Sequence, residues 1–225
     1  MSADAISGRG DSSSVGAVPT GARTIRGMLE TRPGVWFWQS RHPNWVPDDG
    51  WDEVVSSYAL DDGEQLIVID PLAPPPELDE LASKRQTTIA LTCQWHRRDS
   101  EDLAARLGAT IYVPAPNPED TEEPVKGERY GPGDTLPGGI EVVCGLDETD
   151  LVLWSRHHAA IAVGDVLVDR GEGLVLPLDW ADKRSGPEPI RARLRPLLDA
   201  GVEVVLPGHG LPTDRAALAL ALGLT

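Results

Sequence analysis

VEVVLPGHG (202–210) is a short apolar run that ends in a loop in which one histidine stands between two glycines. This run predicts the last strand of the chain, which ends in that loop. The flanking glycines let the backbone approach a ligand closely, and imidazole is a favoured ligand of transition metals. We therefore interpret His209 as a site residue at the end of a strand rather than as a surface histidine.

AAIAVGD (159–165) has the same form, because its apolar run is followed by a Gly-Asp step that places Asp165 at the end of a strand. Such a dipeptide is also common at hairpin turns, so the alternative is a polar turn residue. The other predicted strands cover residues 34–40, 54–62, 65–70, 87–93, 110–116, 140–144, 150–155 and 166–169, and the predicted helices lie within 74–85, 99–108, 187–201 and 213–223. This order predicts an α/β fold in which two sheets are covered by helices.

Strand-end loops of αβ folds commonly carry the chemistry. We expect five of them to converge here, namely those after Asp70, Cys93, Cys144, Gly164 and Pro207.

Turn and cap residues define the connections. Helix 99–108 has Asp99 or Ser100 as its expected cap, and the last helix has Thr213. Polar residues with several Pro and Gly predict one long loop over 116–139. A hairpin turn through 156–158 would leave His157 and His158 facing solvent, and His42 gives no site signal.

Composition narrows the class of protein. The net charge of −16, from 36 acidic and 20 basic residues, argues against nucleic acid and anionic membranes as partners, because both require clustered Lys and Arg. Residues 1–23 are rich in Ser, Gly and Asp and lack an apolar signal segment, so they predict a flexible tail before one domain at 24–225. Two cysteines make a disulfide framework unexpected, and we expect a cytoplasmic protein.

Tryptophan is unusually frequent, and four of the seven lie between Trp36 and Trp51. They suit either packing of the first strands or an aromatic lip over a pocket, since indole combines an apolar body with a hydrogen-bond donor.

From about residue 34 onward, the order of these landmarks resembles the metallo-β-lactamase superfamily. Residues 58–63 followed by 66–70 resemble its opening hairpin and strand-ending aspartate, and Leu91-Thr92 resembles the start of its metal-binding loop. Residues 162–165 resemble the strand with the bridging aspartate, and 206–210 resemble the final histidine loop. The resemblance implies a four-layered αββα sandwich and a small-molecule hydrolase.

The metal-binding loop departs from the family pattern. In the family, the threonine is followed by the motif His-x-His-x-Asp-His. The corresponding sequence in this chain is Thr92-Cys-Gln-Trp-His-Arg-Arg-Asp99. Aligned on Thr92, the ligand positions hold Cys93, Trp95, Arg97 and Arg98, and neither Trp nor Arg can bind a cation. A shift by one residue places His96 and Asp99 at ligand positions but still leaves two unsuitable residues. The sequence of this loop resembles a divergent bacterial branch of the superfamily whose metal-binding signature is degenerate. A two-zinc site is therefore not expected.

The resemblance implies a reduced ligand set. The candidate metal ligands are His96, Cys144, Asp165 and His209, the candidate catalytic residues are Asp165 and His96, and the candidate substrate-binding residues are Arg97 and Arg98. Cys93 and Cys144 have three possible roles: they are thiolate ligands of the metal, or a redox pair, or small residues buried in the core.

Two functions stay open at this point. The first is hydrolysis of an ester, thioester, lactone or phosphoester with one zinc, manganese or iron ion. The second is metal-free binding of a small anion on the same fold. Oligomeric state has no signal in the sequence.

Overall fold

The computed structural model describes residues 23–25, 27–48, 50–116, 123–178 and 186–224. The predicted flexible tail lies outside these residues, except for Arg23, which begins the first strand. Among the described helices, none is long and apolar enough to cross a membrane.

The first sheet contains eight strands in chain order. They are β1 (Arg23–Ile25), β2 (Met28–Arg32), β3 (Val35–Arg41), β4 (Val54–Asp61), β5 (Gln65–Ile69), β6 (Gln86–Ala90), β7 (Thr110–Pro114) and β8 (Glu128–Tyr130). Strands β1 to β5 pair antiparallel, and β5 to β8 pair parallel. The helices α1 (Glu77–Ala82) and α2 (Ser100–Leu107) provide two of the crossovers that parallel pairing requires.

The second sheet has six strands in the order β16-β15-β12-β11-β10-β9. They are β9 (Thr135–Leu136), β10 (Ile140–Cys144), β11 (Leu151–Ser155), β12 (Ala160–Gly164), β15 (Val204–Pro207) and β16 (Thr213–Asp214). Strands β12 and β15 are parallel neighbours although about forty residues separate them in the chain. Their carboxyl ends therefore meet at one edge of the sheet. The remaining elements are the pair β13 (Val168–Asp169) and β14 (Leu174–Val175), the helices α3 (Glu188–Asp199) and α4 (Arg215–Ala221), and two short 3₁₀ helices, Gln94–Arg97 and Pro137–Gly139.

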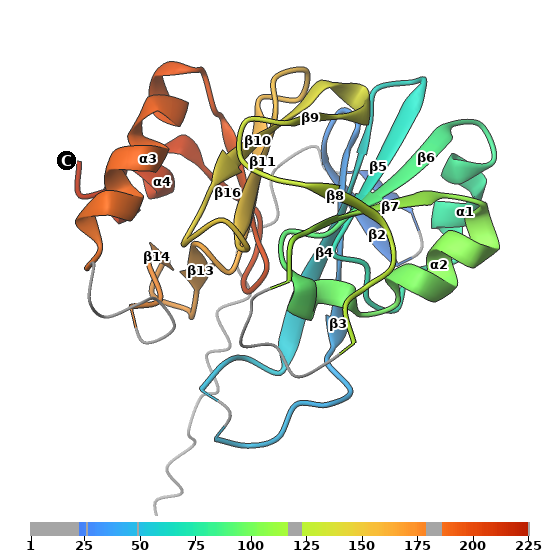
Figure 1. Ribbon diagram of the computed structural model, residues 1–225, viewed down its shortest axis with the longest axis horizontal. Coiled ribbons are helices and arrows are strands. Elements are labelled where there is room, and N and C mark those ends of the chain that lie inside the picture. The colour runs from blue at the N-terminus through green and yellow to red at the C-terminus, as the bar shows by residue number, and fades with distance from the viewer. Residues whose placement is uncertain (1–22, 26, 49, 117–122, 179–185, 225) are drawn as a thin grey trace, which may run out of the picture.

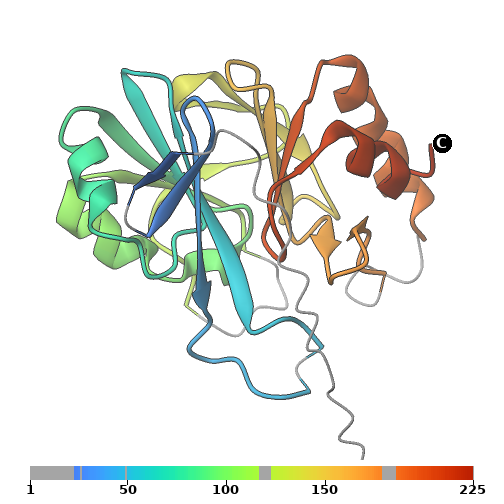
Figure 2. The same cartoon turned by 180° about the vertical axis from the view of Figure 1, so that it is seen from behind.

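Three apolar clusters show how the layers stack (Figures 1 and 2). The central cluster joins the two sheets, one outer cluster packs α1 and α2 on the first sheet, and the other packs α3 and α4 on the second. Strand residues alternate between clusters: Val35 lies in the central cluster and Trp36 in an outer one. This period of two explains why the strands are apolar on both faces. The predicted four-layered αββα sandwich is confirmed.

Several local predictions need correction. The segment 116–139 is not one loop, because β8 and β9 lie within it. Asp214, not Thr213, caps α4, since its carboxylate accepts the Ala217 N–H at 2.9 Å. Asp99 stands at the start of α2 but makes no cap hydrogen bond there, because its carboxylate accepts the Ala73 N–H at 2.6 Å.

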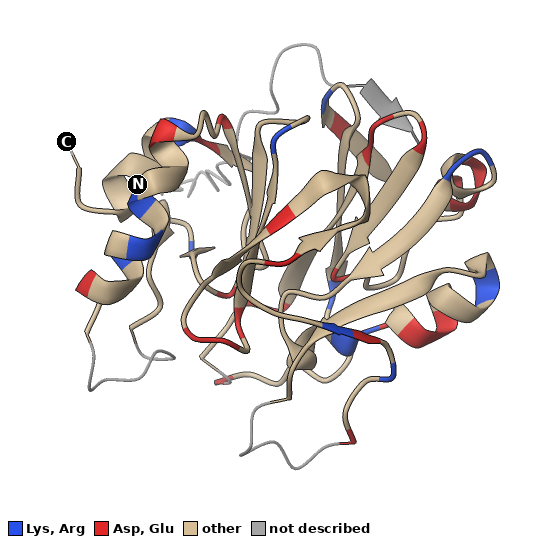
Figure 3. Cartoon of the chain, turned by 45° about the horizontal axis from the view of Figure 1, so that its top comes forward, with Lys and Arg blue, Asp and Glu red and all other residues tan. Residues whose placement is uncertain are grey.

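Charged residues lie on helices and loops in several layers of the fold (Figure 3). Lys and Arg are spread over several of the described elements, with Asp and Glu among them. The exclusion of nucleic acid as a partner stays a prediction.

Candidate functional site

Four strand ends bring the site together at one edge of the sandwich. Asp70 follows β5, His96 lies in the 3₁₀ helix that follows β6, Asp165 follows β12 and His209 follows β15. The parallel pairing of β5 with β6 and of β12 with β15 places each pair of ends side by side. Three of these residues were candidates from the sequence, whereas Asp70 was recognised only as a landmark.

The His209 loop is held against the first sheet by the backbone and side chains of β4. Ser56 donates from its backbone N–H to Gly208 at 2.9 Å and from its hydroxyl to Gly210 at 2.6 Å. The buried hydroxyl of Tyr58 donates to the Pro207 carbonyl at 2.6 Å. The close packing requires a small residue, because a Cβ at Gly208 would lie 3.1 Å from Asp165 Oδ1. These bonds fix the imidazole of His209 beside Asp165.

His96 is oriented by a buried carboxylate. Its Nδ1 lies 2.9 Å from Asp70 Oδ2, and Thr92 holds the same carboxylate through its backbone N–H at 2.9 Å and its hydroxyl at 2.6 Å. Burial alone would raise the pKa of Asp70, but His96, Arg98 and Thr92 outweigh it and lower that pKa. Asp70 is therefore an anion that fixes the ring and directs Nε2 of His96 toward Asp165.

Asp165 stands between two imidazoles. Its Oδ1 lies 3.3 Å from His96 Nε2 and 3.6 Å from His209 Nε2. Burial alone would raise the pKa of Asp165, but the charges of His96 and His209 outweigh it and lower that pKa to about 2. Asp165 is ionised at neutral pH, and within the described residues its Oδ1 is buried without a hydrogen bond.

Cys93 and Asp150 complete the buried cluster. The Cys93 sulfur, a His96 nitrogen and an Asp165 oxygen lie within 4.8 Å of one another. Burial raises the pKa of the Cys93 thiol to about 12. Burial, together with the charges of Asp165 and Asp147, raises the pKa of Asp150 to about 7. The sequence interpretation missed Asp150, which precedes β11 and carries no motif.

The donor atoms fit a single metal ion. Zinc accepts imidazole, carboxylate and thiolate ligands, and tetrahedral bonds of about 2.0–2.2 Å place neighbouring ligand atoms roughly 3.3–3.6 Å apart. The distances from Asp165 Oδ1 to the two imidazoles, 3.3 and 3.6 Å, match this spacing, whereas the group whose ligand atoms all lie within 4.8 Å of one another holds Cys93 with His96 and Asp165 and does not hold His209. The bond from Asp70 to His96 Nδ1 is the carboxylate–histidine arrangement that orients metal ligands. The expectation that a two-zinc site is lost, because Trp95, Arg97 and Arg98 stand where the family pattern has ligands, stays a prediction.

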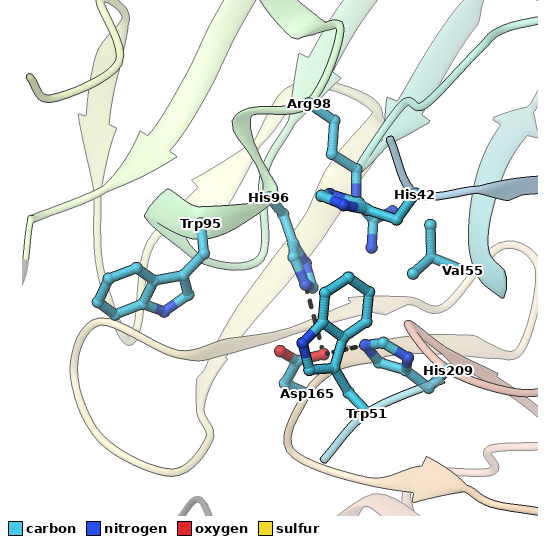
Figure 4. Close-up of a pocket in the computed structure, with 8 residues that line it drawn as sticks. All are labelled: His42, Trp51, Val55, Trp95, His96, Arg98, Asp165 and His209. Carbon is cyan, nitrogen blue, oxygen red and sulfur yellow. Dashed lines mark ion pairs between the residues drawn. The ribbon is translucent and has the colours of Figure 1, made fainter. Parts of the chain in front are cut away.

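A pocket of about 270 Å³ opens onto this cluster (Figure 4). Its lining residues are His42, Trp51, Val55, Trp95, His96, Arg98, Asp165 and His209. Trp51 lies edge-on to His209 with ring centroids 5.7 Å apart, and Trp95 is 53% exposed at the rim. Trp36 and Trp38 are instead buried in the core, so both interpretations of the tryptophans apply, each to different residues.

Four of the sequence predictions place residues differently from the structure. Arg97 is not among the pocket residues and pairs with Glu101 at 2.8 Å, whereas Arg98 lines the pocket. Cys144 lies on the second sheet with its sulfur 2.8 Å from Arg193 Nη1, and the group of candidate ligands contains Cys93 instead. His158 is buried rather than solvent-facing, because it bonds to Ser155 at 2.8 Å. His42 does belong to the pocket, where its ring lies 5.0 Å from that of Trp51.

The lowered pKa of His209 predicts that the stability of the fold depends on pH. Burial lowers the pKa of His209 from 6.5 to about 4, although the charge of Asp165 opposes the shift. The unfolded chain then binds more protons between these values, so His209 stabilises the fold above pH 6.5 and this contribution is lost as the pH falls toward 4. The shift corresponds to at most about 3 kcal/mol. Urea unfolding of chelated protein from pH 7 to 4 measures it.

The variant for this measurement is His209→Gln, compared with the wild type. His209→Gln should flatten the loss of stability between pH 6.5 and 4. Equal profiles for wild type and His209→Gln would contradict the assignment.

The sequence matches no model of a protein family, and it matches no curated protein. Solved structures do match: the metallo-β-lactamase DIM-1 exposed to ceftazidime has a TM-score of 0.66 at 18% identity, with 90% of this chain and 95% of that chain covered. TMB-1 has a TM-score of 0.60 at 17% identity, with the same coverage.

A metallo-β-lactamase family protein from Thermus thermophilus matches with a TM-score of 0.55 at 17% identity, covering 85% of this chain and 79% of that chain. The class that these comparisons define is an αββα sandwich. This chain has the metallo-β-lactamase fold, as its sequence landmarks predict.

Proposed function

We propose that the protein is a metal-dependent hydrolase that uses one metal ion held by His96, Asp165 and His209. The observation that carries this proposal is the environment of Asp165 Oδ1, which is buried without a hydrogen bond among the described residues and faces two imidazole nitrogens. The fold supports the same conclusion, since it is shared with metallo-β-lactamases.

Three protein ligands suit a catalytic ion, because a catalytic zinc keeps one coordination position open. Cys93 is close enough to be a fourth ligand, because its sulfur lies within 4.8 Å of a His96 nitrogen and an Asp165 oxygen. We do not propose Cys144 as a ligand, because its sulfur contacts Arg193.

A bound zinc, manganese or iron ion would polarise the scissile bond and lower the pKa of a water molecule. The residues of the chain have separate tasks around it. His96 is a ligand rather than a general base, because both of its ring nitrogens face carboxylates. Asp165 remains anionic through its low pKa, and Trp51 covers His209 and limits access of bulk water.

The proposal is tested by elemental analysis of purified, tag-free protein after growth with zinc, manganese and iron. We expect about one equivalent of one metal per chain, which a chelator removes and re-addition restores. Hydrolysis of an ester, a thioester, a lactone and a phosphoester should follow the metal content. Less than about a tenth of an equivalent, with the fold intact by circular dichroism, would refute the proposal.

A further inference from the structure

Arg98 is placed in the pocket by an unusual backbone conformation. It ends the 3₁₀ helix Gln94–Arg97 with φ 36° and ψ −123°, a region that residues with a side chain rarely adopt. Such strain persists only where the surrounding structure maintains it, and it occurs most often at functional sites. The result is that two adjacent arginines diverge, since Arg97 pairs with Glu101 outside the pocket and Arg98 enters the pocket.

The guanidinium group of Arg98 is anchored by one nitrogen only. Its Nη1 donates to the carbonyl oxygens of Ser56 at 2.9 Å and Asp70 at 2.8 Å. Both acceptors are neutral backbone groups, and among the described residues no carboxylate forms an ion pair with Arg98. The two anchoring bonds fix the position of the group, while its other N–H donors make no hydrogen bond to the described residues.

Charged and uncharged groups both surround this cation: its charge lowers the pKa of Asp70 and of Asp165, and the pKa of the neighbouring His96 is raised well above its usual value. Burial and the charges of Arg98 and His96 lower the pKa of His42, so this neighbouring imidazole is neutral near pH 7. Val55 and Trp51 form apolar walls. The nearest anions are already engaged, because Asp70 faces Thr92 and His96, and Asp165 faces the two imidazoles.

A fixed guanidinium with unused donors recognises a planar or tetrahedral oxyanion, since its fork matches carboxylate and phosphate geometry. Figure 4 shows Arg98 and His42 on one side of His96, and Asp165 and His209 on the other. A molecule lying across the pocket would therefore contact Arg98 with one end and the proposed metal site with the other.

We infer that Arg98 forms an oxyanion-binding subsite and that the substrate of the hydrolase carries a carboxylate or phosphate beside its scissile bond. The substrate class rests on the proposed function, whereas the subsite itself does not need the metal. Arg98 stands at a position where the family pattern has a metal ligand. Its guanidinium group therefore supplies a fixed positive charge where the family pattern would help to hold a metal ion.

The test uses calorimetric titration of chelated, metal-free protein with benzoate, phenylphosphonate and the neutral isostere benzamide, in a buffer without competing anions. Wild type should bind at least one of the two oxyanions about tenfold more tightly than benzamide, and added salt should reduce the difference. The preference between benzoate and phenylphosphonate identifies the anion. Equal affinity of all three for wild type would overturn the inference without any variant.

Three variants locate the effect. Arg98→Gln should lose the preference for the oxyanion and retain its affinity for benzamide, which also shows that the pocket is folded. Arg98→Lys should retain part of the preference, and the matched control Arg97→Gln should retain all of it. Equal losses in Arg97→Gln and Arg98→Gln would show a general charge effect and overturn the inference.

The oxyanion titration and the elemental analysis test the subsite and the hydrolase separately. Oxyanion binding that depends on Arg98, in a protein that holds less than about a tenth of an equivalent of metal after growth with zinc, manganese and iron, would refute the proposed hydrolysis and support the subsite. One equivalent of metal with no preference for an oxyanion would support the hydrolase and overturn the subsite.

Discussion

Replacing Asp165 with asparagine is expected to lower the metal content from about one equivalent to below about a tenth and to abolish metal-dependent hydrolysis. The physical reason is that Asp165 Oδ1 lies against both imidazole nitrogens, at 3.3 and 3.6 Å, so it is the shared centre of the ligand group. Asparagine keeps the shape but removes the negative charge that offsets a dication. Elemental analysis and the rate of hydrolysis measure the two effects.

The matched control is Asp134→Asn, because Asp134 is an exposed aspartate whose carboxylate only accepts the Gly131 N–H. This variant should keep both metal and activity. Full metal content in Asp165→Asn would show that the ion lies elsewhere, and a loss in both variants would show a general effect of charge.

Gly164→Ala should destabilise the fold strongly. Gly164 has φ +47°, and a Cβ at this position would lie 2.4 Å from the Thr92 hydroxyl oxygen and 2.8 Å from Thr92 Cβ. Thr92 cannot move away easily, because its hydroxyl donates to buried Asp70. Backbone strain and overpacking together predict a loss of roughly 2–5 kcal/mol in the free energy of unfolding, measured by urea denaturation of the chelated protein.

Gly201→Ala separates the two contributions. Gly201 also has a positive φ, +91°, but no atom lies within 4 Å of the position that a Cβ would take there. Its loss should be limited to the backbone term, about 1 kcal/mol. If the two variants lose the same stability, the contact with Thr92 does not constrain the site.

Much of the fold was predictable because its signals are local. The apolar runs that end in Asp70, Asp165 and His209 are strands that the structure confirms to within a residue or two. Errors arose where two local signals were nearly equivalent. Thr213 and Asp214 are both good cap residues, and only the entry angle of α4 selects Asp214.

The candidate site was only partly predictable. Asp165 and His209 stand out because each follows an apolar run, whereas Asp150 and Trp51 carry no motif. Trp51 reaches His209 across a long connection between β3 and β4, and no sequence spacing reports such a contact.

The sequence by itself therefore determined the order along the chain of the longer strands, the layered architecture and the strand-end positions of Asp165 and His209, because burial imposes a period and a length on apolar runs. The tertiary structure alone decided which side chains of the loop after β6 enter the pocket. Arg97 and Arg98 are chemically identical neighbours, and they part only because the backbone at Arg98 takes a positive φ where Ser56 and Asp70 offer their carbonyl oxygens.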